Sequence, residues 1–474
     1  MVFSSPIFLF VFFPFTLLGY FILPNKFRNL YLLLVSLGFF ASTGKNALLI
    51  FIFFIGLNYL FGLAIEHSKR SAKSWVRRLV FMVSIAADIS MLLFFKYANF
   101  FVATLNQIAG VNFNFRVSMG VLGISFFTFN ALSYLLDINS GKIKAHRNLL
   151  EFSLYMSFFP KLLQGPIARF RSFIPEVKER IINTAVVAEG ILRFTQGLAK
   201  KVIIADEMGI VVDQIFSLPA NQIPIAVSWL GAVGYALQIY FDFSGYTDMA
   251  LGIGKMLGFN LPENFNYPYI SASISEFWRR WHITLSSWFR DYLFIPLEFK
   301  RRRVKFLRSE TNILIVFLLT GLWHGASWNF VVWGLLHGFF ISLEVFAKSL
   351  RLKWKLPYPV KLISTILIIL IGWVIFRSND LPYAGQYLGI MFGFISNEPS
   401  PATSGSIINS KFLFFFIIGT LACLPWKIWG EKFIAKVDSR PRLLLRTISI
   451  IFLLVYSIIL VLSSSYKPFI YFQF

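Results

Sequence analysis

Five histidines are the side chains of this 474-residue chain best suited to acid–base chemistry near neutral pH. One of them, His324, lies in the segment GLWHGASW between two apolar runs. Counting from Arg308 places it about 18 Å into a membrane at 1.5 Å per residue. An ionisable group at that depth is costly and is a functional hypothesis by default. Its neutral imidazole could act as a general base, and the alternative is a hydrogen-bonded structural histidine in a helix bundle.

The neighbours of His324 favour a helix break or a close backbone approach. We expect Trp323 and Trp328 to flank the imidazole. No Asp or Glu occurs between Glu310 and Glu344, so an orienting carboxylate must come from elsewhere in the chain. The small residues that allow the break are Gly321, Gly325 and Ser327.

The other histidines favour different roles. We interpret His337, in WGLLHGFF, as a helix-packing residue, and His67 and His146 as solvated loop residues. His282 lies in EFWRRWHITLSSWFRDYLFIPL, at the edge of an aromatic stripe with helical spacing. The stripe consists of Trp278, Trp281, Leu285, Trp288 and Tyr292.

This stripe predicts one amphipathic helix at the cytoplasmic membrane interface. Arg279, Arg280 and Arg290 lie off the stripe, and Glu276 is placed to pair with Arg280 at i, i+4. An anchor helix with an incidental His282 is the alternative to a catalytic histidine.

The remaining motifs mostly exclude other known kinds of catalytic or cofactor-binding site. The block FDFSGYTDMALGIGKMLGFNLPENFNYPY contains Asp242, Asp248 and Glu263 and predicts a polar cavity wall. Its glycines miss the dinucleotide-binding spacing, and the chain has no P-loop, HExxH motif or nucleophile elbow. His282 and Asp291 are separated by eight residues, not the four of soluble glycerolipid acyltransferases. A single cysteine excludes zinc clusters and an internal disulfide framework, and we expect no metal.

The elements that position these residues must be membrane helices. The chain is 57% hydrophobic and 14% charged, with a net charge of +23. This composition excludes soluble and disordered classes, and the low charge density argues against nucleic-acid binding. A polytopic membrane protein with basic cytoplasmic loops explains both properties.

Apolar runs predict an all-α protein with about 11–13 transmembrane helices. The first run is expected to be a retained span, because no Lys or Arg precedes it as in a signal peptide. Residues 150–165 are too polar and short to cross, so we expect them to dip into protein or lie at the interface. The candidate spans are 6–23, 29–43, 47–65, 79–103, 119–137, 186–215, 224–243, 312–323, 328–347, 362–376, 412–428 and 447–463.

The basic residues predict the orientation of these spans. With the N-terminus outside, about 36 of the 45 Lys and Arg fall on cytoplasmic loops and about five on external loops. Both termini are therefore predicted to be extracytoplasmic, as is the loop 394–410. His282 then belongs to the cytoplasmic side and His324 lies deeper. A polar path between them could carry a chemical group across the membrane.

Long motifs around these histidines resemble the membrane-bound O-acyltransferase (MBOAT) family. YISASISEFWRRWHITLSSWFRDYLFIPL and GLWHGASWNFVVWGLLHG carry the family resemblance. Other stretches resemble the bacterial branch that contains the alginate O-acetyltransferase membrane subunit, and they are spread over almost the whole chain. These stretches are GISFFTFNALSYLLDI, SFFPKLLQGPIARF, GLAKKVIIAD, FDFSGYTDMA, PENFNYPY, the start MVFSSPIFLF and the end KPFIYFQF.

The resemblance implies a single membrane domain over 1–474, with a catalytic core at about 119–347. Its helices would form a ring around a central acyl-transfer tunnel. It also implies catalytic roles for His324, the essential family histidine, and His282, the second signature position. Arg279, Arg280 and Asp248 are candidates for lining the path of the acyl donor.

The implied reaction is O-acyl transfer in a bacterial plasma membrane, with no bound cofactor. Acetyl-CoA would be the acyl-donor substrate, and a basic run from Lys300 to Arg303, with Lys305 and Arg308, could attract its phosphates. Because cytoplasmic loops are basic in any case, orientation alone could explain that run. The acceptor would be an extracytoplasmic polysaccharide such as alginate, reached through a secreted or anchored SGNH-type acetyltransferase partner.

Two departures from the family pattern and three alternative functions remain. Glu298 and Phe299 follow Leu297 where the branch usually has two glycines, which bears on the loop geometry, and no family role is carried over to His146. Within the family, the chain could instead transfer D-alanine to teichoic acid. From other classes, it could be a glycan transporter, which inverted repeats would favour, or a scaffold of a polysaccharide synthase.

Overall fold

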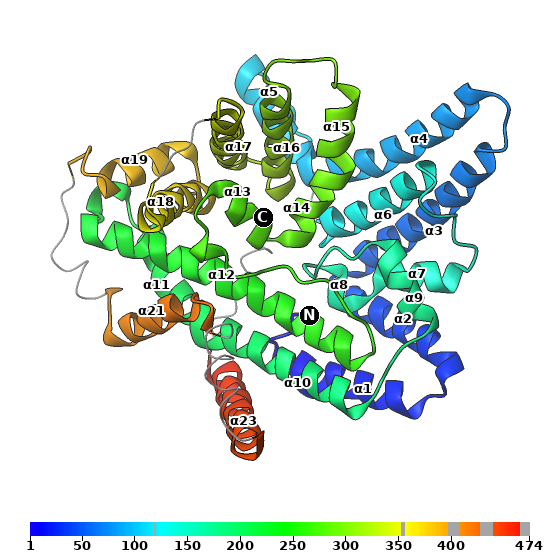
Figure 1. Ribbon diagram of the computed structural model, residues 1–474, viewed down its shortest axis with the longest axis horizontal. Coiled ribbons are helices and arrows are strands. Elements are labelled where there is room, and N and C mark those ends of the chain that lie inside the picture. The colour runs from blue at the N-terminus through cyan, green and yellow to red at the C-terminus, as the bar shows by residue number, and fades with distance from the viewer. Residues whose placement is uncertain (118–119, 352–355, 397–406, 427–438, 465–474) are drawn as a thin grey trace. The chain divides into compact units, whose positions relative to one another are not determined.

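The structure is a computed structural model that describes the chain except residues 118–119, 352–355, 397–406, 427–438 and 465–474. Within the described ranges every regular element is a helix, which confirms the predicted all-α fold (Figure 1). The chain forms two compact units. Unit 1 comprises residues 1–194 and 249–262, and unit 2 comprises residues 195–248 and 263–474. The prediction of one membrane domain, with a core at 119–347, stays a prediction.

Unit 1 consists of the helices of residues 1–194 together with the segment 249–262. Two helices, α10 (Thr184–Ala199) and α12 (Ile225–Met256), contribute residues to both units. The others are α1 (Phe13–Ile22), α2 (Asn25–Ala41), α3 (Lys45–Ser68), α4 (Ser74–Leu92), α5 (Ala98–Ala109), α6 (Ile124–Asn139), α7 (Leu149–Ser157), α8 (Phe159–Leu162) and α9 (Phe170–Lys178), with π-helices η1 (Phe8–Phe12) and η2 (Leu93–Tyr97).

In the described part of the chain, four helical segments are long and apolar enough to cross a membrane: α3, the continuous run Ser74–Ala109, α17 (Trp328–Ser349) and α18 (Tyr358–Arg377). Shorter apolar helices cover Phe8–Ile22, Ser410–Ala422 and Thr447–Ser463. Two predicted spans have different structures. The span 186–215 consists of α10 and α11 (Asp206–Ser217) joined by the π-helix η3 (Lys200–Ala205), and the span 224–243 is only the first part of α12.

Residues 150–165 dip into unit 1, as predicted. They form α7 and α8, which pack against α2, and residues 154–168 are all buried. The segment begins at Asn148, whose side chain caps α7 by accepting hydrogen bonds from the backbone N–H groups of Leu150 and Glu151 at 3.0 and 3.2 Å. A polar segment can lie at this depth because protein surrounds it.

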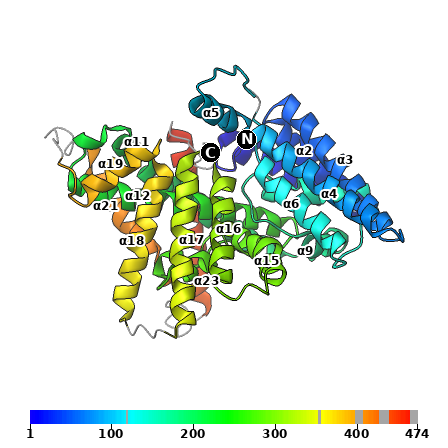
Figure 2. The ribbon, with the colours of Figure 1, turned by 90° about the horizontal axis from the view of Figure 1, so that it is seen from above.

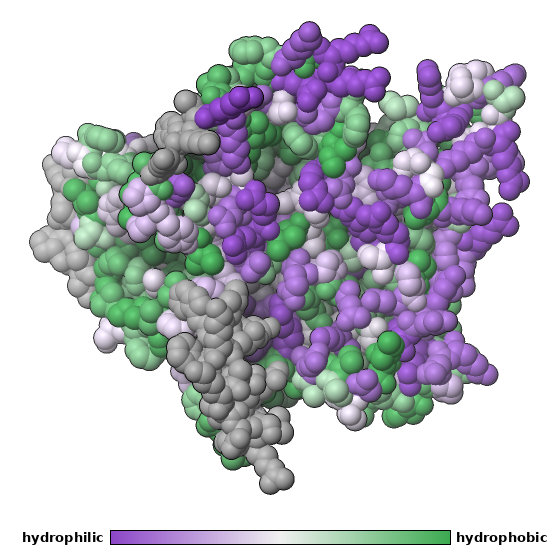
Figure 3. Space-filling view, viewed as in Figure 1, coloured by the Kyte–Doolittle hydropathy of each residue, from purple (hydrophilic) through white to green (hydrophobic). Residues whose placement is uncertain are grey.

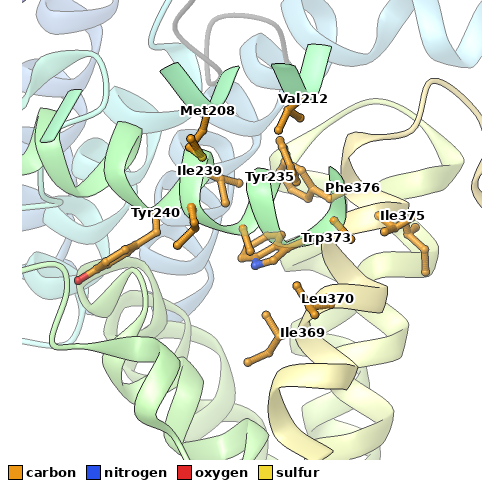
Figure 4. Packing of buried hydrophobic residues seen from close by; sticks show 14 of the residues in the cluster. Met208, Val212, Tyr235, Ile239, Tyr240, Ile369, Leu370, Trp373, Ile375 and Phe376 are labelled. Carbon is orange, nitrogen blue, oxygen red and sulfur yellow. The ribbon is translucent and has the colours of Figure 1, made fainter. Parts of the chain in front are cut away.

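Unit 2 holds residues 195–248 and the chain from residue 263 onward. Its remaining helices are α13 (Ile274–Arg280), α14 (Ile283–Phe289), α15 (Ile295–Lys300), α16 (Arg308–His324), α19 (Leu381–Met391), α21 (Ser410–Ala422) and α23 (Ser439–Ser463), with π-helix η6 (Arg290–Phe294) and 3-10 helices η4 (Ala220–Gln222) and η5 (Pro268–Ile270). Its core includes side chains of α11, α12 and α18, and Figure 4 shows Trp373 and Phe376 of α18 near Tyr235 of α12. Burial of such large aromatic side chains is a major source of core stability.

A tight helical hairpin of α16 and α17 lies next to α18 (Figure 2). Its two helices touch at glycines. A Cβ on Gly321 would lie 2.2 Å from the carbonyl oxygen of Phe330, and one on Gly334 would lie 2.3 Å from that of Phe317. The predicted close approach around His324 is therefore confirmed, and only glycine fits at these two contacts.

Some sequence predictions fall outside the described residues. They include most of the loop 394–410, the terminal segment KPFIYFQF, and the orientation charges Lys353, Lys355, Lys427, Lys432, Lys436 and Lys467.

Candidate active site

The predicted single helix around His282 is wrong, because the chain breaks there. His282 has φ 44° and ψ 53°, in the left-handed region, and separates α13 from α14. The aromatic stripe is also not an exposed membrane anchor, since Trp278, Trp281 and Trp288 are buried in unit 2. These rings pack against other apolar side chains of the unit, so the stripe is a core face.

Asn264 stabilises the break and fixes the tautomer of His282. Its Oδ1 accepts hydrogen bonds from the backbone N–H and the hydroxyl of Thr284 at 3.1 and 2.9 Å. Because a backbone N–H can only donate, this atom must be the amide oxygen. His282 Nδ1 lies 3.2 Å from the same oxygen and therefore carries the proton. The other ring nitrogen, Nε2, is left with a free lone pair.

This Nε2 atom of His282 is a buried base. It has no hydrogen-bond partner within the described part of the chain, and the residue is fully buried. Burial disfavours the charged imidazolium and lowers the pKa of His282 to about 3. The ring is therefore neutral at physiological pH and can accept a proton only from a strongly activated donor.

His324 lies at the C-terminus of α16, where the helix ends before the extended Gly325. Its ring is nearly perpendicular to those of Trp323 and Trp333, with centroids 4.9 Å apart in both pairs. Trp323 therefore flanks His324 as predicted. Trp328 does not, since it is 53% exposed and Trp333 takes the place predicted for it.

A chain of aromatic contacts brings three histidines into one cluster. The ring of His282 lies 6.1 Å from that of Trp323, which contacts His324. On the other side, Trp333 lies 5.2 Å from the ring of His337. His337 also packs closely against α18, where a Cβ on Gly372 would be 2.8 Å from its Nε2. The predicted packing role of His337 is confirmed, and the residue also belongs to the histidine cluster.

Unpaired hydrogen-bonding groups concentrate in this cluster. Trp278, Trp333 and His337 have side-chain nitrogens with no hydrogen-bond partner within the described ranges. Buried polar groups usually have partners, and an indole N–H can only donate. The carbonyl oxygen of a ligand, or a water, would satisfy these donors.

Glu344 of α17 positions α13 and was missed by the sequence reasoning. Its carboxylate accepts hydrogen bonds from the backbone N–H groups of Ile274 and Ser275 at 2.7 and 3.1 Å. The carboxylate thus caps the helix that carries Trp278. Only the absence of other acids between Glu310 and Glu344 hinted at a special role in the sequence.

The three residues predicted to line the donor path lie in different surroundings. Arg279 is exposed at the end of α13. Arg280 donates to Glu276 at 2.9 Å, as predicted, and to the backbone oxygen of Asn266 at 3.1 Å. Asp248 is buried on α12 and pairs with Lys200 at 2.7 Å. Nothing in these contacts brings the three side chains together.

The predicted polar wall contains a second buried ion-pair group. Lys201 of η3 lies 2.7 Å from both Asp206 and Asp242. Asp242 precedes Phe243, whose ring is 4.7 Å from that of His282. The ion pairs therefore fix the part of α12 that packs against His282.

The two remaining histidines lie elsewhere. His67 is exposed at the end of α3, as predicted. The prediction of a solvated His146 is wrong, because its Nε2 lies 2.7 Å from Glu151 and its ring packs 5.3 Å from Phe170. In the described part of the chain, no three His, Cys, Asp or Glu side chains gather as a metal site would require.

The buried imidazoles provide bases and hydrogen-bond donors of the kind that acyl transfer to a hydroxyl uses. A profile of the membrane-bound O-acyltransferase family matches residues 139–379, which include the whole histidine cluster. The chain belongs to the MBOAT family. It is therefore a multi-pass membrane protein and an O-acyltransferase, so the transporter and scaffold alternatives are set aside.

Individual MBOAT relatives are similar over most of the chain. "Probable alginate O-acetylase AlgI" of Azotobacter vinelandii is 41% identical over 403 residues, covering 83% of this chain and 78% of that protein. "Peptidoglycan O-acetyltransferase" of Helicobacter pylori is 36% identical, with 83% and 80% covered. "Teichoic acid D-alanyltransferase" of Bacillus subtilis is 34% identical over a shorter match, with 53% and 65% covered.

Proposed function

We propose that this MBOAT protein passes an acetyl group from cytoplasmic acetyl-CoA across the membrane for O-acetylation of an extracytoplasmic polysaccharide of the alginate type. The observation that carries the proposal is the similarity to the "Probable alginate O-acetylase AlgI" over 83% of the chain. The histidine cluster lies within residues 139–379, which the family profile matches. The buried cluster supports it, because transfer of a thioester acyl group to a hydroxyl requires a base in a water-poor site.

In the proposed mechanism, His324 is the general base. The acceptor hydroxyl oxygen attacks the thioester carbonyl while its proton moves to the imidazole of His324. The C–S bond then breaks, the new C–O bond remains as the ester, and the imidazolium returns the proton to the thiolate. Packing of His324 between Trp323 and Trp333 holds the ring in one orientation, which favours this proton transfer.

His282 is proposed as a neutral partner in the same reaction. Its Nε2 lone pair, fixed by the hydrogen bond of Nδ1 to Asn264, can accept a hydrogen bond from a second N–H or O–H group of the bound donor or acceptor, other than the reacting hydroxyl. The low pKa of His282 makes it a poor proton carrier. It is therefore suited to orienting a bound substrate, while His324 takes the proton of the reacting hydroxyl.

Topology and partners complete the proposal. Both termini lie outside the cytoplasm, and the donor enters a central tunnel from the cytoplasmic face of the bacterial plasma membrane. Arg279, Arg280 and Asp248 line the donor path. A secreted or anchored SGNH-type acetyltransferase carries the acetyl group to the final polymer. The charge asymmetry of 36 against five basic residues supports this orientation.

A second candidate is D-alanyl transfer to teichoic acid. The similarity to the Bacillus subtilis protein, which covers 53% of this chain, favours it. The similarity to the Helicobacter pylori protein makes peptidoglycan a further acceptor to test. Both relatives are less identical to this chain than the alginate O-acetylase, so the acetyl and alginate assignments are preferred.

The test uses inside-out membrane vesicles that contain the full chain. Labelled acetyl-CoA and labelled D-alanyl carrier protein are added separately outside these vesicles, with alginate, peptidoglycan or teichoic acid as acceptor and the partner acetyltransferase present. We expect label in alginate from acetyl-CoA only. Label from the D-alanyl carrier alone would overturn the proposal, as would labelling of alginate in vesicles without this protein.

A further inference from the structure

The loop between α15 and α16 presents cations and aromatic rings on the surface of unit 2. We call residues 299–307 the basic loop. Phe299 and Phe306 in it are 69% and 75% exposed. In Figure 3 hydrophilic side chains gather at the top of the view, over this loop. The exposed cations of the loop are Lys300, Arg302, Arg303 and Lys305.

The loop is held in place by Glu298, which lies in the first turn of α15. Glu298 accepts hydrogen bonds from Arg308 Nε at 2.9 Å, Ser309 Oγ at 3.1 Å and Asn312 Nδ2 at 2.6 Å. Arg301 in turn donates to Asn312 Oδ1 at 2.6 Å. These bonds tie the two ends of the loop together before any ligand arrives.

The same network leaves four cations without partners. Arg301 and Arg308 use their guanidinium groups within the protein. For the side chains of Lys300, Arg302, Arg303 and Lys305, no ion pair or hydrogen bond to another described residue is found. A preformed loop with four free cations has the charge and the rigidity to bind a multiply charged anion.

The basic loop joins α15 to α16 (Figure 1), and the two proposed catalytic histidines stand at the far ends of the two helical arms that it joins. One arm begins just after His282 and runs through α14, η6 and α15 without a break to Lys300. The other arm is α16, which begins at Arg308 and ends at His324. Each arm is roughly 25 Å long at 1.5 Å per residue. An elongated ligand could therefore hold its anionic end at the loop and its reactive end at the histidines.

We propose that the basic loop binds the 3′-phosphate and diphosphate of coenzyme A, with the adenine ring against Phe299 or Phe306. This inference rests on the proposed function, in which acetyl-CoA is the donor. Arginine guanidinium groups match phosphate oxygens in bidentate geometry, and exposed aromatic rings stack on nucleobases. Three phosphoryl groups and one base complement four cations and two rings.

An anionic lipid surface also attracts basic and aromatic side chains. The donor nucleotide is the occupant we favour, because the Glu298 network shapes this loop and both arms of the hairpin lead from it to the histidines. A lipid headgroup needs neither feature. Binding to lipid is therefore an outcome that would overturn the inference.

The test compares acetyl-CoA with 3′-dephospho-acetyl-CoA as donors for the full chain in vesicles of neutral lipid. The test variant is Arg302→Ala with Arg303→Ala. We expect its KM for acetyl-CoA to rise about tenfold with kcat unchanged, since tenfold corresponds to losing about 1.4 kcal/mol of binding. The preference of the wild type for acetyl-CoA over the dephospho donor should shrink toward one. The charge-retaining pair Arg302→Lys with Arg303→Lys should recover part of the affinity.

Arg77→Ala with Arg78→Ala is the matched control, because this pair is also exposed but belongs to unit 1. It should leave both KM values unchanged. An unchanged KM in the Arg302/Arg303 variant, with an active wild type, would overturn the inference alone. The inference would also be overturned if KM rose equally for both donors, and only when the measurement is repeated in vesicles with anionic lipid. A wild type that neither binds nor uses acetyl-CoA would instead overturn the proposed function.

Discussion

Asn264 holds His282 in one tautomer. Its side-chain oxygen lies 3.2 Å from His282 Nδ1 and accepts two further hydrogen bonds from Thr284. One amide oxygen thus fixes the protonated ring nitrogen, the left-handed backbone at His282 and the start of α14. The free Nε2 of His282 is a consequence of this single contact.

We therefore expect Asn264→Leu to reduce both stability and acetyl transfer. It leaves the buried Nδ1–H of His282 and two donors of Thr284 without partners, at about 1–3 kcal/mol per unsatisfied group. Thermal unfolding in detergent and initial transfer rates measure the two effects. Asn266→Ala is the control, because that side chain is exposed and its backbone N–H bond to Arg280 remains. An Asn264→Leu protein with unchanged transfer would exclude the tautomer role.

The low pKa of His282 predicts a pH dependence of stability. Between pH 6.5 and 3 the unfolded chain binds a proton at His282 that the folded protein does not, so acidification favours unfolding. Below pH 6 this histidine should remove about 1.4 kcal/mol of stability per pH unit. In His282→Gln the melting temperature should therefore fall less steeply from pH 6.5 to pH 4.5 than in the wild type. Parallel curves for the two proteins would show that His282 is not buried as a neutral ring.

Glycine contacts in the α16–α17 hairpin predict a packing effect. Gly321→Ala and Gly334→Ala place a Cβ within 2.2 and 2.3 Å of backbone oxygens, so the helices must separate. We expect about 1–3 kcal/mol of destabilisation for each variant. Acetyl transfer should also fall, because α16 carries His324 at its C-terminal end. The control is Gly385→Ala on helix α19, where the new Cβ meets open space. The free energy of unfolding of this variant should equal or slightly exceed that of the wild type. Equal melting temperatures for all three variants would contradict the hairpin geometry.

The sequence was sufficient to predict the all-α membrane fold and the buried position of His324. Long apolar runs and glycines next to a lone histidine are local signals, and the structure retains both. The polarity of residues 150–165 also predicted that they do not cross, and the structure selects the path into protein over the interface.

Features that depend on distant residues were not predictable in this way. The aromatic spacing around His282 continues through the helix break and therefore does not reveal it. The break is stabilised by hydrogen bonds to Asn264, which is 18 residues away in the sequence. Glu344 caps α13 from 70 residues away. Trp333 replaces Trp328 beside His324 because the α16–α17 contact at Gly321 and Gly334 sets the register of the two helices. Glu298, a departure from the family pattern, organises the basic loop through Arg308, Ser309 and Asn312.

The most direct test of the account is acetyl transfer by His324→Ala, measured with labelled acetyl-CoA in vesicles that contain equal amounts of folded variant and wild type. Loss of a general base should lower the rate by about 10²–10⁴-fold. The exposed-histidine control His67→Ala should retain the wild-type rate. A His324→Ala protein that accumulates, folds and transfers acetyl groups at the wild-type rate would contradict the central claim.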